Sequence, residues 1–100
     1  MSGTGAQRVD LWLFRARLFK SRSLAGRFVE AGAVRLERGG QVARLTRASA
    51  GVRPGDRLTY VRFEKLVRVS VLALGDRRGP PAEARALYMI EDAKGRTTED

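Results

Sequence analysis

The chain has 100 residues, of which 43% are apolar, so it can bury one modest hydrophobic core but not two. It contains no apolar run near the roughly 20 residues that a membrane span needs. The first residues lack the basic start and apolar stretch of a signal peptide. The absence of cysteine excludes disulfides. We therefore expect a single-domain cytoplasmic protein that does not associate with a membrane.

Charge gives the first positive indication of function. The net charge is +9, and residues 8–57 alone carry twelve basic and four acidic side chains, a net +8. A concentrated positive field attracts polyanions and raises the rate of encounter with them. This pattern favours a nucleic acid as the partner over an anionic membrane, an acidic protein or a basic surface that is simply solvated.

The first predicted element after a flexible leader, residues 1–7, is a helix that begins at Val9. Asp10 falls in its first turn, where a carboxylate suits the helix dipole. One apolar arc recurs at helical spacing and consists of Val9, Trp12, Leu13, Ala16 and Phe19. A second apolar strip, on the opposite side, consists of Leu11, Phe14 and Leu18. This second strip requires another neighbour, and Leu87 and Ile90 are available to cover it.

A second helix is predicted to begin at Ser21, whose hydroxyl can accept an otherwise unpaired backbone N–H. Gly32 is predicted to end this helix, because glycine adopts the left-handed conformation readily. The expected apolar face consists of Leu24, Ala25, Phe28, Val29 and Ala31. The two helices are expected to be separated by only a residue or two, as a tight helix-turn-helix pair.

Beyond Gly32 the apolar period changes to two, which is typical of strands. Strands are predicted at residues 34–36, 42–45, 58–61 and 66–74, with turns at residues 37–40 and 53–56. Residues 75–81 break the pattern, residues 82–90 are predicted to form a short helix, and residues 91–100 a polar tail. The predicted fold class is α+β: a helix-turn-helix pair packed on a small, mostly antiparallel sheet, with a short C-terminal helix.

The residue types argue against catalysis. Without histidine the chain lacks the side chain best suited to proton transfer near neutral pH. Without histidine or cysteine it also lacks the usual ligands of zinc and redox metals. The glycines at positions 39, 40 and 51 do not match the spacing of a phosphate-binding loop. We expect no enzyme activity, no cofactor, no metal and no small-molecule substrate.

The candidate binding residues are the bases on and between the two helices. Arginine grips phosphate with two parallel hydrogen bonds and can stack on bases. A phosphate at the start of the second helix would meet backbone N–H groups together with Lys20 and Arg22. The same three residues, Lys20-Ser21-Arg22, are equally consistent with a plain capping turn. The positions selected on charge and helix position alone include Arg15, Arg17 and Arg27.

Several short motifs, in the same order and spacing, resemble the S4 RNA-binding domain family. They are Arg8-Val9-Asp10, Leu13, Lys20-Ser21-Arg22 with Ala25, Val29, Gly32-Ala33-Val34 and Pro54-Gly55-Asp56-Arg57-Leu58. The match covers about residues 8–61. It implies an S4-like (alpha-L) fold over residues 8–74, extended by a C-terminal turn and short helix at residues 75–90. It also implies RNA contacts from Arg8, Lys20, Ser21 and Arg22.

Within that family the chain is most similar to a group of small stand-alone bacterial heat-shock proteins. Trp12 with Phe14 and the segments 19–22, 77–80 and 84–88 carry this similarity. The resemblance implies binding to structured ribosomal RNA, on the large (50S) ribosomal subunit that carries a stalled nascent chain on tRNA, with tRNA a possible contact. The implied role is ribosome rescue or recycling in a stress response. The segment 37–40 departs from the family's Asn-Gly turn, so no RNA contact is implied there.

Two alternatives stay open. The chain resembles an RNA-targeting module of the kind attached to pseudouridine synthases, whose catalytic domain would lie elsewhere. It is also consistent with a protein-interaction module that uses the strip of Leu11, Phe14 and Leu18 on an acidic partner.

Overall fold

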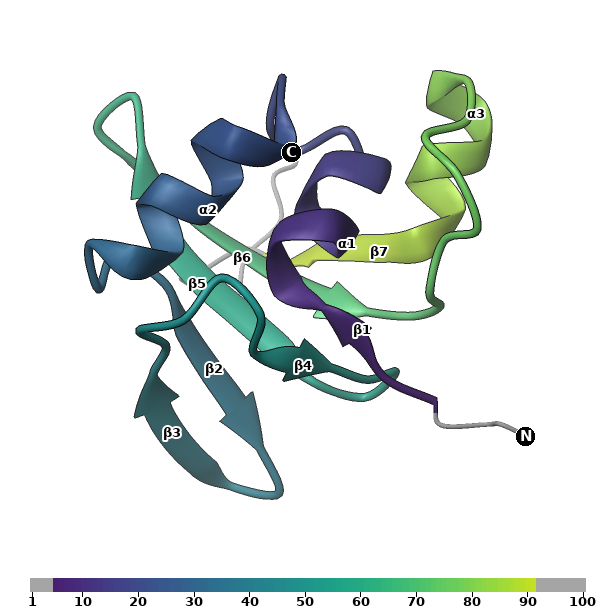
Figure 1. Cartoon of the computed structure of the whole chain (residues 1–100). Coiled ribbons are helices and arrows are strands. Elements are labelled where there is room, and N and C mark those ends of the chain that lie inside the picture. Colours follow the sequence, from purple (N-terminus) through teal and green to yellow (C-terminus); the bar gives the residue numbers. More distant parts are fainter. Residues whose placement is uncertain (1–4, 92–100) are drawn as a thin grey trace.

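The computed structural model describes residues 5–91, which form two helices packed on one face of a five-stranded antiparallel sheet (Figure 1). This pair of helices is α1 (Val9–Arg15) and α2 (Arg22–Glu30), and a third, shorter helix lies near the end of the described residues. The sheet order is β3-β2-β5-β6-β7, with β2 at Arg35–Arg38, β3 at Gln41–Arg44, β5 at Arg57–Arg62, β6 at Lys65–Val71 and β7 at Tyr88–Glu91. The predicted α+β class with a helix pair on an antiparallel sheet is confirmed.

The strand register explains which side of the sheet is buried. Leu36, Leu58 and Val69 lie opposite one another on three neighbouring strands, so their side chains share a face, and all three are buried. The next row, Arg35, Thr59 and Arg68, points to the other face. The helices cover only the first of these faces.

Trp12 is the largest side chain in the core and is fully buried. Its indole Nε1 donates a hydrogen bond to the Ala73 carbonyl at 2.8 Å, which satisfies the one polar atom of the ring. The buried cluster joins both helices to the sheet and contains all five residues of the predicted arc: Val9, Trp12, Leu13, Ala16 and Phe19. The predicted apolar arc therefore faces the core.

The first helix is shorter than its apolar arc suggests. After Arg15 the chain closes a Schellman motif, in which the N–H of Arg17 bonds to Phe14 O and the N–H of Leu18 bonds to Leu13 O. Arg17 takes the left-handed conformation there, with φ 62°. Six residues, 16–21, separate the helices, so the predicted gap of a residue or two is wrong. Periodicity missed this end because an arginine occupies the position that glycine usually marks.

The second helix begins and ends where the sequence predicts. The Ser21 Oγ accepts a hydrogen bond from the Leu24 N–H at 3.0 Å, so Ser21 is the N-cap. At the other end Gly32 has φ 78°, and its N–H and that of Ala33 bond back to Val29 O and Phe28 O. A left-handed glycine closes this helix with the same motif that closes α1.

Two short strands lie outside the main sheet. β1 (Gln7–Arg8) pairs antiparallel with β4 (Gly51–Val52), and neither was predicted. The Gln7 side chain also donates to the Gly75 carbonyl at 2.8 Å. The prediction of a flexible leader is therefore wrong at Gln7, because backbone pairing and this side-chain bond hold it. Residues 1–4 of that predicted leader lie outside the described residues.

The C-terminal region corrects another prediction. Residues 82–90 were expected to be a short helix, but the helical part consists of α3 (Pro81–Ala84) and the 3-10 turn η1 (Arg85–Leu87). The chain then forms β7, which pairs with β6 through Val71 and Tyr88. Glu91, placed in the predicted polar tail, ends this strand, and residues 92–100 lie outside the described residues. The region therefore adds a strand to the main sheet, since Tyr-Met-Ile suits an edge next to β6.

The second strip of α1 is covered differently from the prediction. Leu87 packs against the core, but Ile90 is 58% exposed on β7 and does not cover α1. Phe14 is instead covered by Arg78, whose guanidinium lies 4.8 Å from the ring centroid and whose Nε donates to the Phe14 carbonyl. Across residues 5–91 no helix is long and apolar enough to cross a membrane.

Candidate nucleic-acid interface

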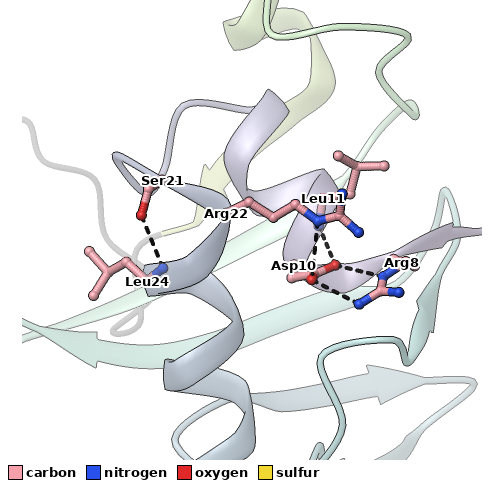
Figure 2. Close-up of polar contacts among 6 residues, drawn as sticks. All are labelled: Arg8, Asp10, Leu11, Ser21, Arg22 and Leu24. Carbon is pink, nitrogen blue, oxygen red and sulfur yellow. Dashed lines mark hydrogen bonds and ion pairs between the residues drawn. The ribbon is translucent and has the colours of Figure 1, made fainter.

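A buried carboxylate organises two arginines at the junction of β1, α1 and α2 (Figure 2). Arg8 donates from Nε and Nη2 to the two oxygens of Asp10, both at 3.1 Å. Arg22 reaches the same carboxylate from α2, with its Nε 3.3 Å from Oδ2. Residues that are 14 positions apart in the chain, Arg8 and Arg22, are thus fixed beside each other.

Asp10 stays ionised in this position. Burial alone would disfavour the charged carboxylate, but the hydrogen bonds from Arg8 and Arg22 outweigh it, so the pKa of Asp10 lies below its ordinary value. The backbone N–H of Leu11 adds a hydrogen bond to Oδ1 at 2.7 Å. The sequence indicated only a favourable helix-dipole contact for Asp10, and its role as the shared ion-pair partner was not predicted.

The pairing leaves donors for an incoming anion. Two guanidiniums face one carboxylate, so the group keeps a net charge of +1. The side chains of Arg8 and Arg22 are 48% and 46% exposed. Within residues 5–91 their remaining terminal nitrogens make no ion pair with another carboxylate. These N–H groups can therefore bind phosphate without breaking the contact that positions them.

An open hollow of about 400 Å³ lies between α2 and this junction. It is lined by Arg8, Asp10, Arg22, Ser23, Gly26, Arg27, Glu30 and Ala48. Its floor is close-packed, because a Cβ at Gly26 would lie 3.4 Å from that of Ala48. Arg27 is exposed and forms no ion pair among the described residues. Glu30 supplies the one acidic side chain that faces solvent along this lining.

Two further predicted residues, Lys20 and Ser21, lie at the N-terminus of α2, directly before Arg22. The Ser21 Oγ accepts the Leu24 N–H as the N-cap of α2, and its hydroxyl hydrogen is still able to donate to a phosphate. Lys20, just before Ser21, is exposed and also lacks a carboxylate partner within the described part of the chain. We define the basic face as Arg8, Lys20, Ser21, Arg22 and Arg27. These are five of the seven predicted site residues: Arg8, Arg22 and Arg27 line the hollow, and Lys20 and Ser21 directly precede Arg22 in the chain.

Arg15 and Arg17, the other two predicted residues, lie apart from the basic face. Arg15 donates from Nη1 to the Gly75 carbonyl at 2.5 Å, and Arg17 donates from Nε to the Gly79 carbonyl at 2.6 Å. Both guanidiniums thus tie α1 and its C-terminal turn to the segment before α3. They were selected on charge and helix position alone, and neither criterion distinguishes a solvent-facing arginine from one that holds a loop.

The described residues offer little for any other chemistry. No group of three or more His, Cys, Asp or Glu side chains within residues 5–91 could hold a metal ion. The other buried carboxylate, Asp56, accepts two hydrogen bonds from Arg38, at 2.8 and 2.7 Å, and one from the Arg53 N–H. This pair fastens the β2–β3 hairpin to the turn before β5 and is structural.

The sequence of the chain matches a known protein family. The family model of the S4 domain matches residues 7–58, more than half of the chain. The chain therefore belongs to the S4 domain family, whose module binds RNA and is not an enzyme. The predicted RNA binding and the predicted lack of enzyme activity are confirmed at this level.

Two relatives show which members of the S4 domain family this chain is similar to. A heat shock protein 15 homolog from Haemophilus influenzae is 29% identical over 93 residues, which is 93% of this chain and 67% of that protein. The trimeric structure of heat shock protein 15 from Vibrio cholerae superposes with a TM-score of 0.72 at 33% identity, over 90% of this chain and 85% of the other. The predicted similarity to small heat-shock members of the family is confirmed, and the chain is homologous to heat shock protein 15.

Proposed function

We propose that this protein binds structured ribosomal RNA on the large ribosomal subunit, and that it acts there when a stalled nascent chain–tRNA is still attached. Its work would be rescue or recycling of such subunits in the cytoplasm, with tRNA as a further contact. The proposed RNA-binding surface is the basic face. Arg15 and Arg17 are assigned to support the segment before α3.

The observation that carries the proposal is the Arg8–Asp10–Arg22 group. Asp10 orders two guanidiniums before any ligand arrives, which lowers the entropy cost of ordering long side chains on binding. Lys20 and Arg27 flank this group without carboxylate partners of their own among residues 5–91. A fixed pair of guanidiniums flanked by two cations without carboxylate partners suits a folded RNA, whose backbone phosphates lie at fixed spacing.

The direct test is charge reversal at the two flanking cations. Lys20→Glu with Arg27→Glu disturbs no contact with Asp10, so the fold is expected to be retained. Each reversal changes the charge by two, so the net charge falls from +9 to +5. Binding to purified large-subunit ribosomal RNA is expected to fall steeply. The slope of log affinity against log salt is expected to flatten by roughly 1 for each phosphate that the variant no longer neutralises.

A matched control separates this face from general attraction. Arg44→Glu with Arg85→Glu makes the same change of net charge at exposed positions on β3 and η1. We expect this control to bind large-subunit ribosomal RNA much more tightly than the test variant. Equal losses in the two variants would reject the basic face as the binding surface. The ribosomal part of the proposal is tested by co-sedimentation with large subunits that carry peptidyl-tRNA against empty subunits, and equal binding to both would contradict it.

A further inference from the structure

The β5–β6 hairpin presents an aromatic ring to solvent. Phe63 is 83% exposed, more than any other large apolar side chain among residues 5–91. Arg62 pairs with Lys65 across the two strands, so Phe63 and Glu64 form a two-residue turn at the tip. An aromatic ring gains almost nothing for folding when it is left in water.

The backbone at this tip is unfavourable for the residues it contains. Phe63 has φ 54° and Glu64 has φ 64°, so both central residues are left-handed. Turns of this shape favour Asn-Gly, and a bulky residue with positive φ is uncommon. Neither the exposure of the ring nor its backbone conformation stabilises the fold, and strained positions of this kind cluster at functional sites.

Arg62 fixes the tip against the connection between α1 and α2. Its guanidinium lies 4.3 Å from the Phe19 ring centroid and 4.8 Å from that of Phe63. Its Nη1 also donates to the Leu18 carbonyl at 3.2 Å. Leu18 and Phe19 immediately precede Lys20, so the exposed ring is held beside the part of the chain that leads into the basic face.

We propose that Phe63 is a platform on which an unpaired RNA base stacks, while the backbone of the same RNA lies on the basic face near Lys20. This inference rests on the proposed RNA-binding function. The Arg62 guanidinium contacts the Phe63 ring on one side, and the remainder of the ring is exposed and open to a flat partner. Every base offers a π-face whatever the sequence, so the platform would select unpaired nucleotides over paired ones.

The test compares three changes, two of them at this position. Loss of a stacked base costs about 1–3 kcal/mol, so Phe63→Ala is expected to weaken binding to large-subunit ribosomal RNA by roughly 5- to 150-fold. The salt slope should stay unchanged, because every phosphate contact is kept. Phe63→Asn should lose binding equally while raising the melting temperature, because asparagine tolerates positive φ. Met89→Ala, at a side chain 53% exposed on β7, is the matched control and should bind normally.

Phe63→Trp gives a direct reading of stacking. Trp12 is fully buried, so the new indole supplies the solvent-exposed emission, and unsubstituted protein gives the baseline. Addition of large-subunit ribosomal RNA is expected to quench it. Tight binding without quenching, or normal binding by Phe63→Asn, would overturn the platform. If the unsubstituted chain itself fails to bind this RNA, the proposed function fails instead. Capture of a protein partner by the ring, with RNA affinity unaltered, would also overturn the platform.

Discussion

Replacement of Asp10 by asparagine distinguishes ordered cations from mere positive charge. Asparagine keeps the shape of the side chain and an oxygen for the Leu11 N–H, but it loses the charge that holds Arg8 and Arg22. The net charge rises by one, from +9 to +10, because one carboxylate is removed. If charge alone set the affinity, RNA binding would become tighter. We expect weaker binding, since both guanidiniums lose their fixed position.

The size of the effect follows from the geometry. Asp10 is only 5% exposed and accepts three charge-assisted hydrogen bonds, but the two arginines are about half exposed, so water screens part of the interaction. We expect the free energy of unfolding to fall by about 1–2 kcal/mol. Each long side chain that must be ordered on binding costs about 0.5–1.5 kcal/mol, so two of them weaken binding by roughly 5- to 150-fold.

The assay is RNA binding at one fixed salt concentration, with urea unfolding of the same preparations. A drop in the urea midpoint is expected together with weaker binding to large-subunit ribosomal RNA. Binding that is unchanged or tighter, in a variant that circular dichroism shows to be folded, would refute the ordering of the arginines as the basis of affinity. Glu30→Gln is the matched control, because it also adds one positive charge beside the hollow but leaves both arginines paired.

Three further predictions concern the framework of the site. Ser21→Ala removes the cap of α2 and should lower the free energy of unfolding by about 1 kcal/mol in urea titration; no change would show that the Oγ bond to Leu24 contributes nothing. Gly32→Ala forces a side chain into φ 78°, 3.1 Å from Arg44 Cδ, and should cost more than about 1 kcal/mol by the same measurement, whereas Gly40→Ala meets no atom within 4 Å and should cost less. The third concerns pH. Burial opposes ionisation of Asp56, but hydrogen bonds from Arg38 and the Arg53 N–H outweigh it, so its pKa is lowered. The stabilisation is present above about pH 4 and is lost as the pH falls below it, so Asp56→Asn should flatten the acid limb of the urea midpoint against pH, and an unaltered limb would contradict this.

The parts of the fold that sequence predicted are those with a local signal. Helical spacing identified the arc around Trp12, and the Ser21 cap and Gly32 stop marked both ends of α2. Alternation identified the longer strands. β1 and β4 have two residues each, too few for any period to show. The end of α1 was hidden because Arg17, and not glycine, takes the left-handed position.

For the candidate site too, the sequence predicted the features with a local signal and missed those that depend on long-range contacts. Charge and motif order selected the residues of the basic face, which lie close together in the sequence or on one helix. The shared contact with Asp10 could not be read from the chain, since it depends on β1 and α2 meeting across α1. The same limit applies to Arg15 and Arg17, whose partners at Gly75 and Gly79 lie 60 and 62 positions further along the chain.

The central claim is that RNA lies across the basic face, and backbone amide chemical shifts test it most directly. Titration of ¹⁵N-labelled protein with a fragment of large-subunit ribosomal RNA should shift the amides of Arg8 and residues 20–27 strongly. The amides of β3, on a hairpin at the edge of the sheet, should move little. Shifts concentrated on β3 and the opposite face of the sheet, with residues 20–27 unmoved, would contradict this claim.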